Sequence, residues 1–475
     1  MVDFNEVYRD VDAAPVRVGL VGAGEFGASL ITQSLDHPRL SVPAVADLDP
    51  DRAVNVLLRC GVAAADIEIC RDAAKVRDVL AAGRGAVVPD GHLLVDADLE
   101  VLVEATGAPE AAASVSEAAI KAGKHLILAS KEMASVCGPM LGRLAADNGV
   151  VYSLPDGDQP SLLIGLISRA ELLGLDVVMA GKASEYDVVW HRAKGELRYH
   201  GKTFEAPDFA DCWNLEGADI PEVLADRAGP LGPTALKSVP DLCEMMLVCN
   251  ATGLKPDFEA FHAPLARTVE LPDVFRPETE GGVLMNAEDG QGVVDIVNCL
   301  RRSDELSLAG GVFVIVRCSD RETWKVIRDK GIPVSSCGNY GLLHNPVHLL
   351  GIEAAASIIA AARGGMPTSG RAPQPTFDLV GRATRAFSAG EVLDMSGHHH
   401  SIDGIEPLVG PAQAAVPGAA LPFYLAANAR LAVDVRPGEI LTVEMVEEPA
   451  NSALWRLRRE QDAAFETPDA AASVT

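Results

Sequence analysis

A glycine-rich turn near the beginning of the chain constrains the fold more than any other feature. The apolar stretch Val16–Val21 has the pattern of a short buried strand, and the sequence G-x-G-x-x-G follows it immediately. Between a strand and a helix, these glycines make a tight turn, let the backbone approach a pyrophosphate and bring the helix close to the strand. The N-terminus of the helix offers N–H groups and a positive dipole end to the anion. We therefore predict a dinucleotide site formed by Gly22, Gly24, Glu25, Phe26 and Gly27.

A carboxylate follows the second predicted strand. Ser41–Ala46 ends at Asp47, about where an acidic residue accepts hydrogen bonds from the ribose hydroxyls of a dinucleotide. The turn Asp47-Leu48-Asp49-Pro50 would also explain this residue without a ligand. An acid here favours NAD by repelling a 2′-phosphate, whereas the nearby Arg52 favours NADP. The predicted cofactor is therefore NADP or NAD.

Two later strand ends add polar groups to the same edge of the predicted sheet. Val101–Thr106 runs into Gly107, and His125–Ala129 is followed by Ser130-Lys131-Glu132. Ligands bind at the carboxyl ends of parallel strands. We therefore predict that Thr106, Gly107 and Lys131 contact the cofactor and that Glu132 contacts the substrate. An ordinary helix start would also account for Lys131 and Glu132.

The order of the elements predicts an α/β protein of three domains. Alternating strands and helices over residues 1–150 indicate a doubly wound Rossmann domain with a parallel sheet. Residues 151–365 mix both patterns and predict an α+β substrate and dimerisation domain. A break rich in glycine and proline precedes residues 376–465, whose short strands and turns predict a small β-rich domain. Residues 466–475 are expected to be disordered.

Composition narrows the class of protein. The 40 Lys and Arg residues against 67 Asp and Glu give a net charge of −27, which repels nucleic acid and anionic membranes. The nine cysteines are odd in number and contain no C-x-x-C pair, as expected of reduced thiols in the cytoplasm. The first residues lack the features of a signal peptide, and no stretch reaches 18 apolar residues. We expect a cytoplasmic protein with a small-molecule substrate.

Several short stretches form a set with a wider resemblance. They are Glu104-Ala105-Thr106-Gly107, Lys131-Glu132, Asp156-Gly157-Asp158-Gln159-Pro160, Asn250-Ala251-Thr252-Gly253, Pro346-Val347-His348-Leu349 and Glu353. With this set the chain resembles the homoserine-dehydrogenase-like oxidoreductases that carry a C-terminal SAF domain, from about residue 16 to residue 465. Ala383–Leu393 and Asp434–Glu439 are similar to SAF repeats.

The resemblance implies a reaction. Members similar to deoxyxylulose-phosphate reductoisomerase rearrange and reduce 1-deoxy-D-xylulose 5-phosphate to 2-C-methyl-D-erythritol 4-phosphate, a step of isoprenoid biosynthesis. In those members Asn, Ile and Lys follow the glycine where this chain has Gly181-Lys182-Ala183-Ser184. In homoserine dehydrogenases an aspartate and a lysine transfer the proton, and Asp158 with Lys182 is the best match here. The resemblance also implies a homo-oligomer.

The residues themselves support the same catalytic group. Asp156 and Asp158 follow a strand that ends at Leu154, and Gln159 then begins a helix. Two such carboxylates can bind a divalent cation, hold an acid/base lysine or merely cap the helix. Lys182 follows the predicted strand Asp176–Ala180, where a loop lysine could donate a proton to a carbonyl. We predict Asp156, Asp158 and Lys182 as catalytic and Gln159 as substrate-binding.

A small cationic cluster offers an anion site. His191, Arg192 and Lys194 could hold a phosphate or carboxylate of the substrate, although a solvated surface run is an equal alternative. His344 and His348 are one helical turn apart by spacing, and they lack a third ligand for zinc. His398-His399-His400 is expected in a solvated loop. No metal site is predicted.

The leading function is therefore hydride transfer between NAD(P) and a small polar substrate. Homoserine oxidation and the oxidation of a polyol or sugar acid are the alternatives within this class. A dinucleotide-sensing regulatory protein is the alternative class, and it would have no need of an acid/base pair. The proposed hydride and proton groups all precede residue 350, so we expect the third domain to be auxiliary to the chemistry.

Overall fold

The computed structural model describes residues 14–465 except 216, 233, 235, 288–290, 318–319, 371 and 398–399. The predicted tail 466–475 and the predicted loop residues His398 and His399 therefore lie outside the described residues. The chain forms two compact units. The first unit comprises Met1–Ser161, Leu349–Glu406 and Pro411–Thr475, and the second comprises Leu162–His348 and Pro407–Gly410.

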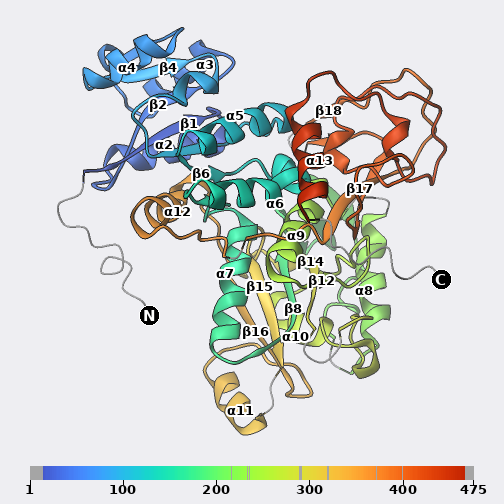
Figure 1. Cartoon of the computed structure of the whole chain (residues 1–475). Coiled ribbons are helices and arrows are strands. Elements are labelled where there is room, and N and C mark those ends of the chain that lie inside the picture. Colours follow the sequence, from blue (N-terminus) through green and yellow to red (C-terminus); the bar gives the residue numbers. More distant parts are fainter. Residues whose placement is uncertain are drawn as a thin grey trace. The chain divides into compact units, whose positions relative to one another are not determined.

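The first unit contains the predicted parallel sheet (Figure 1). In the order β3-β4-β2-β1-β5-β6-β7, its strands are Ile67–Ile69, Gly85–Val88, Leu40–Ala46, Val16–Val21, Val101–Glu104, His125–Leu128 and Tyr152–Ser153. After β1, the chain adds β2 to β4 on one side of β1 and then β5 to β7 on the other side. The strand order therefore reverses between β1 and β5. In doubly wound sheets this switch point opens the crevice for ligands. The predicted α/β class is confirmed.

Helices connect these strands. They are α2 Glu25–Leu35, α3 Pro50–Arg59, α4 Ala73–Ala81, α5 Pro109–Lys121 and α6 Lys131–Asp147, with short 3₁₀ turns η1 Ala64–Asp66 and η2 Gly91–Leu94. Pro109 occupies the first turn of α5, where its missing N–H costs no hydrogen bond. The predicted helix Pro109–Ala122 begins where expected and ends one residue earlier, at Lys121.

A late segment of the chain completes the core of this unit. The sequence predicts one helix over about Val347–Ala362, which is wrong in detail: the structure has a 3₁₀ turn η6 Leu350–Ile352, helix α12 Ala354–Ile359 and the π-helical turn η7 Ala360–Gly364. Leu350 has a φ of 50°, which interrupts the helical backbone, and the carboxylate of Glu353 accepts a hydrogen bond from the N–H of Leu349. Ala354 and Ile358 then pack with β1 and α2 in one apolar cluster.

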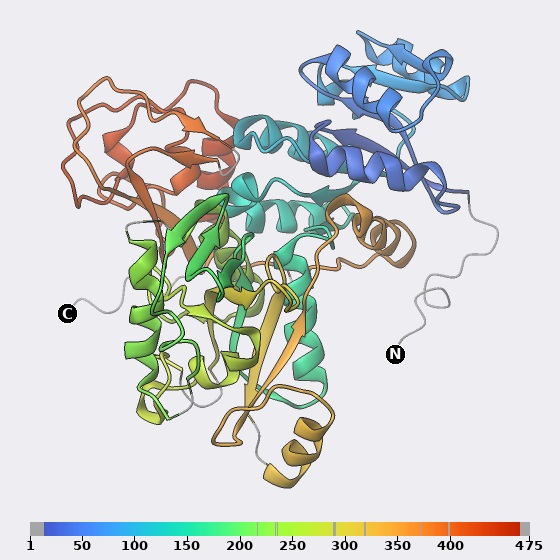
Figure 2. The same ribbon diagram turned by 180° about the vertical axis from the view of Figure 1, so that it is seen from behind.

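The second unit is built on a mixed sheet (Figure 2). In the order β11-β10-β9-β14-β8-β15-β16, its strands are Lys202–Glu205, Glu196–Tyr199, Val188–His191, Val293–Arg302, Asp176–Ala183, Val312–Arg317 and Tyr340–Asn345, and β12 Lys255–Pro256 and β13 Leu265–Ala266 also pair with β14. The helices that follow or cover them are α7 Gln159–Leu172, α8 Ile220–Ala228, α9 Val239–Thr252, α10 Leu271–Val274 and α11 Arg321–Asp329, with short turns η3 Gly229–Leu231, η4 Thr268–Glu270 and η5 Glu278–Glu280.

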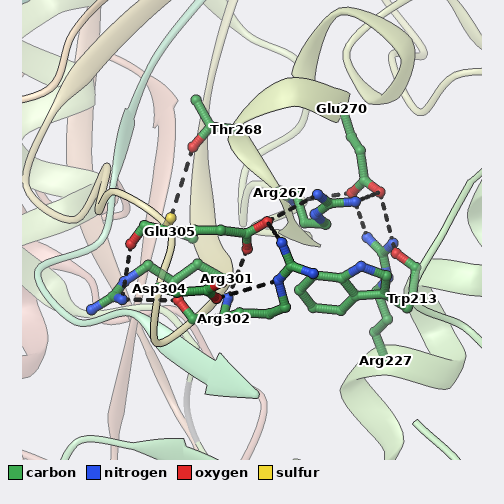
Figure 3. A network of polar contacts seen from close by, with 10 residues as sticks. Trp213, Arg227, Arg267, Thr268, Glu270, Arg301, Arg302, Asp304 and Glu305 are labelled. Carbon is green, nitrogen blue, oxygen red and sulfur yellow. Dashed lines mark hydrogen bonds and ion pairs between the residues drawn. The ribbon is translucent and has the colours of Figure 1, made fainter. Parts of the chain in front are cut away.

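A buried arginine ties the loops of the second unit together (Figure 3). Arg227 is fully buried and pairs with both carboxylate oxygens of Glu270, at 2.8 and 3.0 Å. Its other N–H groups donate to the carbonyls of Cys212, Trp213 and Leu265. All five donors of the guanidinium are therefore used. Because a buried charge is stable only when paired and hydrogen-bonded, this arrangement holds the loop at Cys212 and Trp213, strand β13 and turn η4 together.

The C-terminal block of the first unit has more helix than predicted. Its strands are β17 Phe377–Ala383, β18 Met395–Ser396, β19 Ser401–Ile402 and the ends of β20 Ile405–Pro411, whose residues Pro407–Gly410 belong to the second unit; the turns η8 Phe423–Leu425 and η9 Val443–Met445 and helix α13 Ala453–Phe465 follow. The β-rich prediction omitted α13, whose Trp455 and Leu457 are buried. Gln461 of α13 hydrogen-bonds to α6, accepting from the N–H of Met140. Figure 1 shows α13 beside α5 and α6.

The two stretches that resemble SAF repeats contact each other. The N–H of Phe387 donates to the carbonyl of Val435 at 2.9 Å, and the N–H of Ala383 donates to Glu439 at 2.8 Å. The SAF assignment itself stays a prediction. The eight described cysteines form no disulfide. Among the described residues, no helix has both the length and the apolarity needed to cross a membrane.

Candidate active site

The glycine motif forms the turn that the sequence predicts. Gly22 has a φ of +103°, and a Cβ there would lie 2.4 Å from the carbonyl oxygen of Ala105. A Cβ on Gly27 would lie 2.3 Å from the carbonyl oxygen of Gly22, so this glycine lets α2 approach β1. Gly24 is different, because the nearest atom to its Cβ position is a nitrogen of Arg52 at 3.9 Å. The backbone before α2 is therefore open on one side and fits a pyrophosphate.

Asp47 links the second strand to this turn. Its Oδ2 accepts a hydrogen bond from the N–H of Ala23 at 3.0 Å, and its Oδ1 accepts from the N–H of Asp49 at 3.0 Å. The guanidinium of Arg52 lies 3.9 Å from Oδ2. Asp47 thus makes the local turn and also stands at the glycine motif; its ribose contact stays a prediction. Glu25 is exposed in the first turn of α2, whereas Phe26 packs partly into the core.

The end of β5 holds a buried carboxyl group. Glu104 is fully buried, and its Oε1 accepts from the N–H of Thr106 at 2.9 Å and from the Thr106 hydroxyl at 2.5 Å. Burial raises the pKa of Glu104 to about 7, against the hydrogen bonds from Ser130 and Thr106 that lower it. The N–H of Gly107 donates to Ser130 Oγ at 2.8 Å. Thr106 and Gly107 therefore stand at the switch point, next to Gly22.

A lysine and a carboxylate meet at the same edge of the sheet. Lys131 is the first residue of α6, directly beyond β6, and its Nζ lies 3.3 Å from Oδ1 of Asp158. The side chains of Lys131 and Asp158 are 21% and 13% exposed. Asp158 follows β7 and also accepts from the N–H of Gln159. The pair is thus shielded and still open to a small molecule, the setting that acid/base groups require.

Asp156 and Gln159 flank this pair. Oδ1 of Asp156 accepts from the Ser161 hydroxyl at 2.6 Å. Burial raises the pKa of Asp156, and the hydrogen bonds from Ser161 and Thr368 oppose this shift only in part. Gln159 is buried at the start of α7. The structure therefore gives Asp156 a local structural contact, while its catalytic role and the substrate contact of Gln159 stay predictions.

Lys182 lies elsewhere than the sequence indicated. The prediction of a loop lysine is wrong, because β8 continues to Ala183 and Lys182 is part of the strand. Its side chain is 1% exposed, its Nζ lies 2.8 Å from Oδ1 of Asp241, and it also pairs with Glu244. Burial disfavours the charge of Asp241, but the Lys182 ammonium and Ser238 together lower the pKa of Asp241 below its ordinary value. Lys182 belongs to the second unit and Asp158 to the first, and their predicted pairing stays a prediction.

The sequence did not indicate Asp241 or Glu244 as partners of Lys182. Both lie in the first turns of α9, where Ser238 and Asp241 form a capping box. The spacing Ser238-Val-Pro-Asp241 is a readable signal for that helix start. It does not reveal that the carboxylates face a lysine on a strand more than fifty residues earlier. Only the packing of α9 against β8 brings them together.

The predicted anion cluster lies on a hairpin. His191 ends β9, and the N–H of Lys194 donates to its carbonyl across the turn to β10. Arg192 and Lys194 are exposed, as a solvated turn would have them. Their contact with substrate stays a prediction.

Two histidines do not share a helix. His344 lies on β16 opposite Phe313, so the expected helical spacing of His344 and His348 is wrong. Within the described residues, no group of three or more His, Cys, Asp and Glu side chains is arranged to hold a metal ion. His400 reaches the carboxyl edge of the first sheet, where its Nδ1 lies 2.5 Å from Oε1 of Glu132.

Comparison with known proteins places two segments in families. Residues 22–155 match the NAD-binding domain of homoserine dehydrogenase, and residues 237–354 match the catalytic domain of the oxidoreductase DRL. No curated protein matches the chain.

Similar solved structures are distant. They include KijD10, a 3-ketoreductase from Actinomadura kijaniata in complex with NADP, at 19% identity and a TM-score of 0.25, covering 36% of this chain and 49% of that one. A probable dehydrogenase from Thermotoga maritima has 13% identity and a TM-score of 0.38, covering 75% and 91%. A DOX-P reductoisomerase with fosmidomycin and magnesium has 18% identity and a TM-score of 0.26, covering 36% and 46%. The match thus spans about half the length of the first of these structures.

The open backbone at Gly24 agrees with the first family match. The glycine turn, Asp47 and the switch point all lie in or beside residues 22–155, and the Asp241–Glu244 pair lies within residues 237–354. One segment of the chain thus matches an NAD-binding domain of the homoserine dehydrogenase type, and a second segment matches the catalytic domain of the oxidoreductase DRL.

Proposed function

We propose that this oxidoreductase interconverts a carbonyl and an alcohol on a small polar substrate, and that Lys131 moves the proton. The observation that carries the proposal is the contact between Lys131 and Asp158 beyond the ends of β6 and β7. An ammonium at this edge can protonate or neutralise an oxyanion as it forms, and Asp158 orients the ammonium.

The residues for the cofactor are those of the glycine turn and its neighbours. The turn from Gly22 to Gly27 would hold the pyrophosphate, Asp47 the ribose, and Thr106 and Gly107 the nicotinamide end. The bound cofactor supplies or accepts the hydride. Burial of Glu104 keeps this carboxyl largely protonated below about pH 7, which limits repulsion beside the site.

A second group of charged residues lies in the predicted substrate domain. Lys182 is held by two carboxylates, Asp241 and Glu244. Its predicted role in proton transfer is part of the proposal and is separated from that of Lys131 by experiment. Glu132, Gln159, Arg192 and Lys194 are proposed to bind polar or anionic groups of the substrate.

The first reaction to test is the reductive isomerisation of 1-deoxy-D-xylulose 5-phosphate, which the match to the DRL catalytic domain favours. The match to homoserine dehydrogenase favours the oxidation of homoserine as the second candidate. A polyol or sugar-acid dehydrogenase is the third. We propose that the protein acts as a homo-oligomer in the cytoplasm.

A substrate panel tests the proposal. Purified protein is mixed with NADPH or NADH and phosphorylated ketoses, and with NADP or NAD and homoserine or polyols, while nicotinamide absorbance is followed. Turnover that falls in Lys131→Met and persists in Lys121→Met supports the proposal; Lys121 is an exposed lysine paired with Glu117 on α5. Cofactor binding without turnover of any substrate would instead favour a dinucleotide sensor.

A further inference from the structure

The C-terminal block brings one side chain to the cofactor edge of the first sheet. His400 lies just before β19, and its backbone has a φ of 45°. This is the left-handed region, which histidine adopts more often than most residues other than glycine.

Two contacts fix the imidazole. Its Nδ1 lies 2.5 Å from Oε1 of Glu132, a buried residue in the first turn of α6. On its other side, a Cβ added to Gly107 would lie 2.4 Å from Cε1 and 3.2 Å from Nε2 of the ring. The ring therefore rests directly on the backbone of Gly107, and only glycine permits this approach.

The place of the ring matters because Gly107 follows β5 at the switch point. The hydrogen bond to Glu132 raises the pKa of His400. Burial and the charge of the nearby Lys131 lower this pKa, but they do not cancel the increase. With Nδ1 directed at Glu132, Nε2 is the nitrogen that remains for a ligand. The side chain is 33% exposed, so a bound molecule can reach it.

We propose that His400 is a wall of the nicotinamide subsite and that the C-terminal block is therefore part of the cofactor site. The inference rests on the NAD(P) site and is independent of the substrate. It differs from the sequence-based expectation that this block is only auxiliary. Its Nε2 would contact the nicotinamide half, and the adenine half would lie at the Asp47 end of the crevice, on the far side of the glycine turn.

Binding titrations of the full chain test this assignment without turnover. NADPH and NADH are titrated into wild type and His400→Ala, and so are 2′,5′-ADP and ADP, which contain the adenine half only. We expect the variant to bind the dinucleotides roughly 5- to 10-fold more weakly, the effect of one lost hydrogen bond, and to bind the fragments unchanged. Unchanged or tighter dinucleotide binding would overturn the proposal, because the ring would then be a bystander or an obstacle.

Controls separate a binding contact from a structural one. His92→Ala removes a histidine of the same unit that pairs with a carboxylate, Asp90, at 2.9 Å, and it should leave all four affinities unchanged. Gly107→Ala leaves the imidazole present but displaces it, so it should also weaken dinucleotide binding selectively; because Gly107 is itself proposed to contact the nicotinamide end, this variant tests the subsite and His400→Ala tests the ring. If either site variant weakens the fragments as much as the dinucleotides, the effect is on the fold and the assignment is wrong.

Discussion

The ammonium of Lys131 lies 3.3 Å from Oδ1 of Asp158, at the carboxyl edge of a parallel sheet whose other strand ends carry Gly22, Asp47 and Gly107. This contact joins the first turn of α6 to the turn before α7. It places a cation and its orienting carboxylate in the unit that binds the dinucleotide.

Replacing Lys131 by Met should lower kcat by roughly 10²- to 10⁴-fold, because a positioned proton donor is removed. The dissociation constant for the cofactor should change far less. Asp158→Asn should have a similar effect, and the double variant should be little worse than either single one, as expected of residues that act as a unit. Steady-state kinetics with the identified substrate measure this. Near-wild-type turnover in Lys131→Met, with loss in Lys182→Met, would move the proton donor to Lys182.

Gly24→Val should abolish NAD(P)H binding and leave the fold intact, because the Cβ position at Gly24 is open within the protein. Gly22→Ala should instead destabilise the fold. Its Cβ would meet the Ala105 carbonyl at 2.4 Å, and its φ of +103° strains any L-residue, so thermal unfolding should occur at a lower temperature. Cofactor titration and circular dichroism of both variants check this. Normal binding by folded Gly24→Val would remove the motif from the site.

Asp47→Ser should shift cofactor preference toward NADP. The carboxylate would repel a 2′-phosphate, and Arg52, 3.9 Å away, could pair with the phosphate once the acid is gone. The ratio of the NADP and NAD dissociation constants in wild type and variant measures the shift. A wild type that already prefers NADP strongly would contradict the ribose role of Asp47.

Glu104 should make stability depend on pH. Burial raises its pKa from 4.5 to about 7, so the folded protein holds a proton that the unfolded chain releases. The stabilisation is complete below about pH 4.5 and is lost as the pH rises through about 7. Glu104→Gln stays neutral throughout. The free energy of unfolding of wild type relative to this variant should fall by about 3 kcal/mol across that range, as measured in urea. A constant difference would mean that Glu104 does not titrate.

Glu270→Gln should destabilise the second unit by about 3–5 kcal/mol, because it leaves the buried charge of Arg227 without its partner. Glu448 offers the matched control, since it makes the same two-pronged pair with Arg459 at the surface. Glu448→Gln should cost about 1 kcal/mol or less. Denaturant unfolding measures both. Equal losses in the free energy of unfolding would show that burial does not strengthen the ion pair between Arg227 and Glu270 in Figure 3.

Local signals explain what the sequence predicted well. The glycine motif, the apolar strands and the polar residues at their ends are each encoded within a few neighbouring residues. A doubly wound sheet then brings those ends together by topology alone. That is why β1 was predicted to the residue and why Lys131 was placed at the correct edge.

Other features depended on residues far apart in the chain. The predicted strand stopped at Ala180 because Gly181 and the charged Lys182 follow it, whereas β8 continues to Ala183 and includes Lys182. The strong apolar pattern near residue 350 did not reveal the interruption at Leu350, whose φ is 50°.

The sequence alone determined the fold class and the dinucleotide turn, because glycine at a positive φ and a buried apolar strand are local requirements of the backbone. Only the tertiary structure decided the partners of the charged groups. The ammonium of Lys182 meets carboxylates of α9, and His400 crosses from the C-terminal block to Glu132 and Gly107. The physical reason is desolvation. A charged group that is buried is stable only when an opposite charge or a hydrogen-bond partner lies beside it, and packing decides which residue that is. The number of residues between the two partners in the sequence does not show that they are close in space.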